Sequence, residues 1–335
     1  MLTALRITLA PRMAPRLAVR TFATAAETKA GQISRTVKRT RWAEPVGAHG
    51  PKIHAALRPS DHCSPLDHAS MPRETGFPDH PHRGLTTVTN ILQGQWAHED
   101  FLGNCGTLQP GEVQWMSAGR GIMHCEMPVH DGPNAVDPVA LQLWVDLPAE
   151  KKMVPPSYQG LKKEEIPVAR PSEGVEIGVI SGESHGVVNE KREVALGGTW
   201  WLDIKLSKPG AKVWQPIPAG WTAFIYIVEG NLQVHEGAPI DEQNTAILTK
   251  NSEENGVLLR LPSGDSRPTR AALFAGPPLD QAVYTRGPFV MTNKKDAYAA
   301  VDDFNARRNG FENVEGWRSS IGKGMRIRFP EIGIK

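Results

Sequence analysis

Two segments far apart in the chain share one spacing of glycines and apolar residues. Residues 80–94 read HPHRGLTTVTNILQG, and residues 216–230 read PIPAGWTAFIYIVEG. In both segments the fifth and the last residues are glycine, and the run between them is rich in apolar and β-branched side chains. This order suits an extended entry, a glycine turn, a buried strand and a closing hairpin glycine. Because both halves of the chain carry it at equal spacing, the sequence predicts a duplicated β-structure.

Past residue 35 the chain reads as short strands separated by turn residues. The strand-like segments are rich in β-branched, aromatic and leucine residues, and glycine, proline and asparagine lie between them. Such spacing is typical of all-β sandwiches and barrels. The expected strands are Leu85–Leu92, Val113–Met116, Ala140–Val145, Val175–Ile180, Trp200–Leu206, Thr222–Val228, Val257–Leu261 and Ala271–Phe274. We therefore expect an all-β fold of two barrels in tandem.

Two further segments divide the chain between and after the barrels. Residues 148–173 are rich in proline, lysine and glutamate and lack strand alternation, which is typical of a linker. We therefore place the first barrel at 35–147 and the second at 174–325. Near the C-terminus, the apolar spacing over Lys294–Asn309 predicts one short helix, with Asn293 as its N-cap and a glycine after its end.

Composition excludes several classes of protein. Lys and Arg number 38 and Asp and Glu 36, so the formal net charge of +2 gives no support for direct nucleic-acid contact. No apolar stretch approaches the roughly 20 residues that span a bilayer. Three cysteines are too few for a disulfide framework and indicate a reducing compartment. We expect neither membrane insertion nor secretion.

The first residues differ from the rest of the chain in charge. They contain four arginines and no acidic residue before Glu27. An arginine-rich, acid-free start is typical of a mitochondrial transit peptide, although Pro11 and Pro15 interrupt the amphipathic helix that import requires. We assign residues 1–30 to a mitochondrial transit peptide. The alternative is a disordered basic tail on a cytoplasmic or nuclear protein.

Histidines gather in the first half of the chain. Nine of the eleven lie within residues 49–130. His80 and His82 are two residues apart, so on a strand both imidazoles point to the same face. His124 and Glu126 repeat this spacing after a glycine-rich run. Two such pairs on neighbouring strands supply three nitrogen ligands and one carboxylate, a set that suits Fe(II), Mn, Ni, Cu or Zn.

The second half of the chain lacks the equivalent ligands. At the positions that match the first histidine pair it carries Pro216 and Pro218, whose side chains have no atom that can bind a metal. We therefore expect one metal-binding barrel and one structural barrel. Octahedral iron held by the four candidate ligands would keep two coordination positions for a substrate oxygen and for O₂.

Three long runs resemble a known family. These runs are GFPDHPHRG at 76–84, AHEDFLGNCGTLQPGEVQWMSAGRGIMHCEMP at 97–128 and GPFVMTNKKDAYAAVDDF at 287–304. In their order along the chain they are similar to the pirin family of the cupin superfamily, and the resemblance covers essentially residues 35–325. It implies two cupin barrels, which are double-stranded β-helix or jelly-roll barrels, with a short C-terminal helix. It also implies one iron-binding N-terminal barrel and a metal-free C-terminal barrel.

The pirin resemblance implies a site and two alternative functions. The family's ligands carry over onto His80, His82, His124 and Glu126, which would hold one Fe²⁺. Pirins show quercetin 2,3-dioxygenase activity, which opens the central ring of a flavonol with O₂, and Glu126 is the candidate base for the flavonol hydroxyl. Animal pirins imply instead a redox-sensitive co-regulator that binds transcription factors or metabolic enzymes. A third alternative is a structural or opportunistic metal, because affinity order favours copper or zinc over iron.

Residues around the candidate ligands have more than one interpretation. His98, Glu99 and Asp100 either orient a metal ligand from outside the coordination sphere or form a solvated turn. Cys125 lies between two candidate ligands, so strand alternation turns its thiol away from the metal and predicts a buried packing residue. Arg83 flanks the first histidine pair and holds either an anionic substrate or, as we prefer, a structural carboxylate.

The N-terminal assignment is testable by imaging. The full chain fused to a fluorophore should give a mitochondrial signal that vanishes when residues 1–26 are removed, because this basic, acid-free segment would be the import signal. Fluorescence microscopy with a mitochondrial marker measures this. A nuclear or diffuse signal from the full chain would contradict the transit-peptide assignment.

Overall fold

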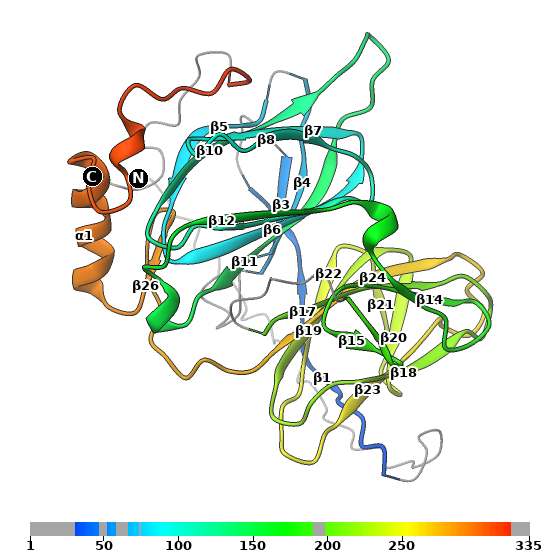
Figure 1. The fold of residues 1–335 in the computed structure, drawn as a ribbon. Helices are drawn as coiled ribbons and strands as arrows, with labels where there is room; N and C mark the ends of the chain where they lie inside the picture. Colours follow the sequence, from blue (N-terminus) through cyan, green and yellow to red (C-terminus); the bar gives the residue numbers. More distant parts are fainter. Residues whose placement is uncertain (1–30, 47–51, 58–65, 74, 190–197, 323–335) are drawn as a thin grey trace, which may run out of the picture.

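The structure, a computed structural model, describes two β-barrels that lie side by side (Figure 1). It covers residues 31–46, 52–57, 66–73, 75–189 and 198–322. The predicted transit peptide at 1–30 lies outside the described residues, so its assignment stays a prediction. No helix in the described part is long and apolar enough to cross a membrane.

The first barrel consists of a large and a small antiparallel sheet. Its strands are β2 (Glu44–Val46), β3 (Lys52–Leu57), β4 (Leu66–Ser70), β5 (Phe77–His82), β6 (Leu85–Gln93), β7 (Gln95–Asp100), β8 (Cys105–Leu108), β9 (Val113–Ser117), β10 (Ile122–Val129), β11 (Val139–Asp146) and β12 (Ser157–Leu161). The seven-stranded sheet has the order β12-β9-β6-β11-β4-β3-β2, and the four-stranded sheet has the order β5-β10-β7-β8.

The second barrel repeats this arrangement. Its strands are β1 (Val37–Trp42), β13 (Val168–Ala169), β14 (Val175–Ser181), β17 (Trp200–Leu206), β18 (Lys212–Pro216), β19 (Thr222–Glu229), β20 (Asn231–Val234), β21 (Pro239–Asp241), β22 (Asn244–Leu248), β23 (Gly256–Arg260) and β24 (Thr269–Gly276). The orders are β1-β22-β19-β24-β17-β14-β13 and β18-β23-β20-β21. The equal sheets confirm the predicted fold of two tandem all-β barrels.

Short elements connect and flank the barrels. They are β15 (Glu183–Ser184), β16 (Val187–Val188), β25 (Tyr284–Arg286), β26 (Phe289–Met291), the α-helix α1 (Lys294–Asn305) and the 3₁₀ turns η2 (Ala149–Lys151), η3 (Lys163–Glu165) and η4 (Glu312–Val314). The predicted helix is present, and the Asn293 side chain caps it by accepting a hydrogen bond from the Asp296 amide at 2.8 Å. The helix ends four residues earlier than predicted, because Arg307 adopts a left-handed φ of 54° and turns the chain.

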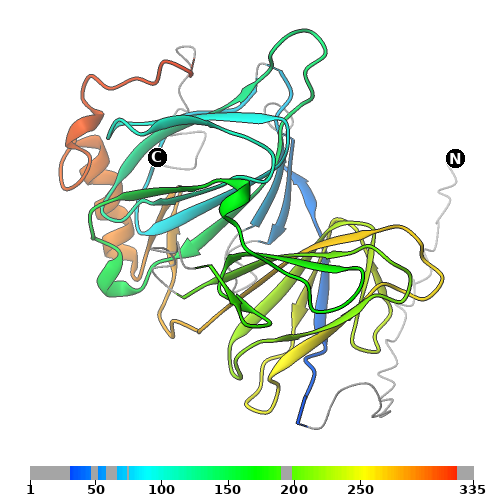
Figure 2. The same ribbon diagram turned by 45° about the vertical axis from the view of Figure 1, so that its right-hand side comes forward.

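Several segments lie elsewhere than the predicted boundaries indicate. β1, which we assigned to the first barrel, pairs with β22 of the second barrel. The predicted linker contains β12, which pairs with β9, and β13, which pairs with β14. Beyond the second barrel, α1 packs against the first barrel, where Phe304 shares an apolar cluster with Met116 and Ile122 (Figure 2). The N-terminal strand β1 therefore belongs to the second barrel, and the C-terminal helix α1 packs against the first.

The two seven-stranded sheets share an apolar core. Val88, Trp115 and Leu143 of the first barrel join Trp201 and Phe274 of the second in one buried cluster. These residues come from central strands of both sheets, so the sheets pack face to face between the barrels. Because side chains alternate along a strand, the intervening residues of the same strands face the two barrel interiors.

The two barrel interiors differ in chemistry. In the second barrel, Ile225 of β19 faces Leu273 of β24 within a wholly aliphatic cluster. In the repeat alignment of the two halves, Thr89 of β6 corresponds to Ile225, and its register partner on β11 is Gln142. The first barrel thus carries hydrogen-bonding side chains where the second carries hydrocarbon, and this places a polar interior behind the candidate metal ligands.

The shared core predicts a large difference between two tryptophans. Trp201 is 1% exposed in the core between the barrels, whereas Trp42 on the edge strand β1 is 53% exposed. Trp201→Ala should lower the free energy of unfolding by about 3–5 kcal/mol through lost burial and the resulting cavity. Trp42→Ala should change it by no more than about 0.5 kcal/mol. Urea unfolding followed by circular dichroism measures both, and equal losses would contradict a shared core.

Candidate metal centre

The two predicted ligand pairs lie on adjoining strands of the small sheet. His80 and His82 lie at the C-terminal end of β5, with His82 as its last residue, and His124 and Glu126 lie on β10. His124 is paired with His80 across the two strands, and the register shifts before Glu126, which is paired with Phe77. Such an irregularity re-aims side chains relative to an ideal ladder.

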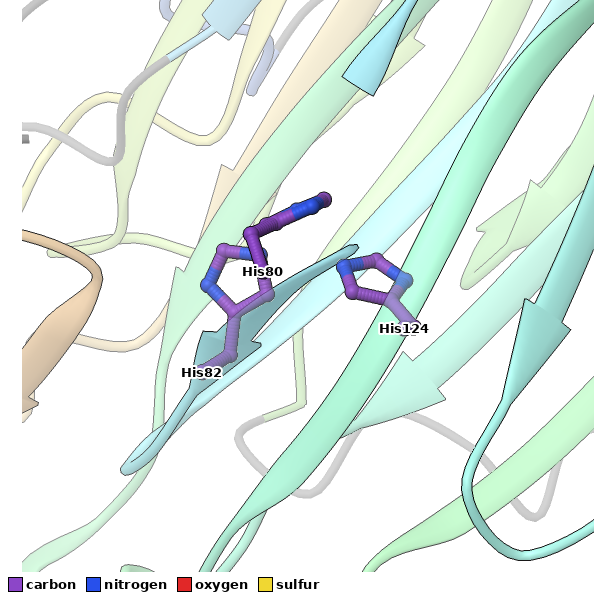
Figure 3. Close-up of side chains that lie close together, drawn as sticks. All are labelled: His80, His82 and His124. Carbon is purple, nitrogen blue, oxygen red and sulfur yellow. The ribbon is translucent and has the colours of Figure 1, made fainter. Parts of the chain in front are cut away.

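The three histidines gather at one point in the first barrel (Figure 3). Their ring centroids lie 4.2 Å apart for His80 and His124, 4.9 Å for His80 and His82, and 5.0 Å for His82 and His124. One nitrogen of each ring lies within 4.8 Å of one nitrogen of each of the others. A metal about 2.1 Å from each nitrogen would hold its ligands no more than about 4.2 Å apart. Small ring rotations therefore suffice to bring all three onto one ion.

Burial keeps these imidazoles neutral. His80, His82 and His124 are 9%, 1% and 2% exposed. Burial lowers the pKa of His80 to about 4. Burial and the neighbouring imidazoles lower the pKa values of His82 and His124 well below the ordinary value. Neutral imidazole is the form that binds a metal, so the cluster needs to release no proton from these rings at pH 7.

Hydrogen bonding around the rings also fits a metal. The Nδ1 of His80 donates to the carbonyl oxygen of Pro78 at 2.9 Å, which leaves the Nε2 lone pair for a ligand. Both ring nitrogens of His124 are buried and have no hydrogen-bond partner. An unsatisfied buried polar group costs about 1–3 kcal/mol, and a bound cation would satisfy one of these nitrogens. The residues present therefore fit a first-row divalent metal.

Glu126 lies beside the histidine cluster but outside the 4.8 Å group. The side-chain amide of Gln142 contacts both carboxylate oxygens, at 3.1 and 3.3 Å, and Thr89 Oγ1 at 3.1 Å. Burial raises the pKa of Glu126 to about 7, and the Gln142 contact opposes this rise. Glu126 is thus poised between its two protonation states near neutral pH. Its roles as fourth ligand and as base stay predictions.

Two residues of this network were not predicted from the sequence. Gln142 holds Glu126, and Trp144 Nε1 donates to Gln142 Oε1 at 3.2 Å. The Trp144 and His82 rings also form a T-shaped contact with a centroid distance of 4.9 Å. One sequence feature pointed to Gln142: it is the only amide in the apolar run ALQLWV of residues 140–145. Because β11 buries both of its faces, such an amide is buried and needs a hydrogen-bond partner.

The residues that follow the closing glycine bind groups other than the three histidines. His98 Nε2 is 3.0 Å from the Tyr158 hydroxyl, and the two rings stack. Asp100 accepts hydrogen bonds from Leu102 and Asn104 and so closes a turn. Glu99 accepts from the backbone amide and the hydroxyl of Ser320. Through these contacts the three residues support the barrel wall. A role in orienting a metal ligand stays a prediction.

The two flanking residues have structural environments. Cys125 is fully buried, and burial raises the pKa of its thiol to about 12, so the thiol stays protonated. Arg83 contacts the Asp303 carboxylate at 2.9 Å in the protein interior. This is the structural-carboxylate alternative that we preferred for Arg83 in the sequence.

These features define a class of protein: a bicupin with a candidate three-histidine metal site in its N-terminal barrel and an aliphatic core cluster in its C-terminal barrel. The chain belongs to the pirin family. The Pirin family matches residues 53–145, and the Pirin C-terminal cupin domain matches residues 201–310.

Known proteins agree with this assignment. The chain is 44% identical to human Pirin over 255 residues, which are 75% of this chain and 83% of that protein. It is 41% identical to a pirin-like protein of Solanum lycopersicum, over 76% of this chain and 84% of the relative. Among solved structures, a quercetin 2,3-dioxygenase from Acinetobacter baumannii superposes with a TM-score of 0.71 at 28% identity, covering 82% of this chain and 98% of that one.

The pH dependence of metal binding tests whether Glu126 is a ligand. A ligating carboxylate must lose its proton, so Co²⁺ affinity should fall about tenfold per pH unit below about 7, where free Glu126 becomes protonated. Glu126→Gln should bind more weakly but show no such step until the histidines protonate, which for His80 is at about pH 4. Competition with a chromophoric chelator between pH 5 and 8 measures this. The same pH dependence in both proteins would exclude Glu126 as a ligand.

Proposed function

We propose that this protein is a dioxygenase of the quercetinase type, which binds Fe²⁺ in its N-terminal barrel and opens the central ring of a flavonol with O₂. The observation that carries the proposal is the cluster of three buried, neutral imidazoles beside one carboxylate that titrates near pH 7. Histidine and carboxylate ligands with open positions are typical of non-haem iron oxygenases. The likeness to the Acinetobacter dioxygenase supports the same substrate class.

Each residue of the candidate site would have its own role in this reaction. His80, His82 and His124 would hold the metal with their neutral ring nitrogens. When bound, iron would supply Lewis acidity and redox chemistry toward O₂. Glu126 would accept the proton of the flavonol hydroxyl on a carboxylate oxygen, since its pKa of about 7 suits a general base at neutral pH. Gln142 would keep that carboxylate oriented.

The side chains beside Glu126 offer contacts that suit a small polar aromatic substrate. Thr89 and Gln142 offer a hydroxyl and an amide next to the candidate base. Trp144 is half-buried, and its indole forms a T-shaped contact with His82 beside the candidate metal site. A few polar groups among apolar walls is the usual composition of a small-molecule site.

Oxygen uptake tests the activity. Full-length protein loaded anaerobically with Fe²⁺ should consume O₂ when quercetin is added, and His80→Ala should reduce the rate to background, because one of three clustered imidazoles is lost. The control variant is His130→Ala, which removes a loop imidazole that pairs with Asp137 and should keep the full rate. Circular dichroism checks that His80→Ala is folded. An oxygen electrode with product analysis makes the measurement.

A negative result favours the second role. If wild-type protein with one bound iron per chain shows no quercetin-dependent uptake, the dioxygenase proposal is wrong. The redox-sensitive interaction role would then use the same ligands, with the iron oxidation state altering a surface that binds a protein partner. A partner search with the Fe²⁺ and Fe³⁺ forms would test that role directly.

A further inference from the structure

We propose that the segment Pro288–Phe311, which follows the second barrel in the chain, is a working part of the metal site in the first barrel. It positions His82 through Arg83 and the turn at Gly84, and Asp303 is its key residue. This inference rests on the metal site of the proposed function but not on dioxygenase activity. It makes Arg83 and Asp303 positioning residues, because neither belongs to the cluster of candidate metal-binding atoms.

The backbone after His82 is clamped by this segment. His82 is the last residue of β5, and the next residue, Arg83, forms a parallel bridge with Phe289. The Arg83 carbonyl accepts a hydrogen bond from the Val290 amide at 3.0 Å. Gly84 then adopts a φ of +78°, and a Cβ atom there would lie 2.0 Å from the Val290 carbonyl oxygen. The C-terminal segment thus approaches so closely that only glycine fits.

A buried lysine closes the same contact. Lys152 Nζ donates to the carbonyl oxygens of Gly84, at 2.8 Å, and of Val290, at 2.9 Å. Its charge is paired with Asp146 at 2.5 Å. One ammonium group therefore holds the turn after His82 and the C-terminal segment together, and a buried charge held by three acceptors resists displacement.

The Arg83 side chain extends the clamp toward α1. Its Nε donates to the carbonyl oxygen of Arg120 at 2.6 Å, one terminal nitrogen to Asp303 Oδ2 at 2.9 Å and the other to the Asn309 carbonyl at 2.7 Å. The guanidinium also lies 4.7 Å from the centre of the Phe311 ring. A planar guanidinium with each of its nitrogens bonded has one permitted orientation.

On α1, Asp303 is the residue that binds Arg83. It is 7% exposed. One carboxylate oxygen accepts from Arg83, and the other accepts from the side chains of Arg308 and Asn309. Replacing this carboxylate leaves the buried Arg83 charge without its partner, which makes Asp303 the single residue on which the clamp most depends.

His82 needs such a clamp more than His80 does. The His80 ring is anchored through Nδ1 to the Pro78 carbonyl, whereas His82 Nδ1 makes no hydrogen bond. The direction of the His82 ring is therefore decided mainly by its backbone and by packing against Trp144. Partners outside the coordination sphere that orient a metal ligand are typically worth about 10–100-fold in affinity.

A matched pair of substitutions on one helix tests the inference. Asp303→Asn removes the charge that faces Arg83, and Asp302→Asn makes the same change on the exposed neighbouring residue. Co²⁺ affinity of the full chain is measured by chelator competition below the unfolding temperature of each protein. We expect Asp303→Asn to bind about tenfold more weakly and to shift the visible Co²⁺ bands, since His82 is misplaced. Asp302→Asn should match the wild type in both readouts.

The outcomes separate this inference from a general loss of stability and from the dioxygenase proposal. Equal affinities and spectra for the two variants would overturn it, and so would equal losses in both. If Asp303→Asn does not fold, Phe311→Leu decides in its place: it removes the ring beside Arg83, and wild-type affinity and spectrum in that variant would overturn the inference. Because Co²⁺ binding is the readout, a protein without quercetin-dependent oxygen uptake can still pass this test.

Discussion

The packing of the two large sheets against each other is the contact on which the rest of the structure depends. It buries aromatic residues such as Trp115, Trp201 and Phe274 between the barrels. Each large sheet is thereby buried on both faces, with the shared core on one side and its own barrel interior on the other. Hydrophobic burial at the shared core supports the fold of both barrels. The interior of the first barrel is therefore free to carry polar residues whose burial does not favour folding.

Specialisation of one barrel follows from that division. In the second barrel the large buried cluster is aliphatic, and Pro216 stands at the position of His80 in the repeat, with Gly256 as its partner across the strands. In the first barrel, His80 faces His124 at the corresponding place. Burying three imidazoles with two unsatisfied nitrogens on His124 is unfavourable in a metal-free fold. The same burial keeps the rings neutral, which is the form that binds a metal. The arrangement therefore lowers the stability of the metal-free fold and keeps the rings in their metal-binding form.

The ends of the chain join the two halves into one assembly. β1 completes the large sheet of the second barrel, and the segment from β26 through α1 covers the first. The contact between Arg83 and Asp303 spans 220 residues of sequence. A first barrel cut from the chain at the predicted boundary would lose this contact. Residues from both halves of the chain therefore surround the candidate metal centre, although all of its candidate ligands lie in the first half.

Local periodicity in the sequence determined much of this protein's fold and of its candidate site. Alternation along strands brought His80 and His82 to one face, the repeated glycines marked two equivalent barrels, and Asn293 marked the start of the helix. Only the tertiary structure decided that Gln142 holds Glu126 and that Asp303 holds Arg83. Periodicity reports which face of its own element a side chain occupies. It carries no information about which distant element covers that face, because this depends on the packing energy of the folded chain as a whole.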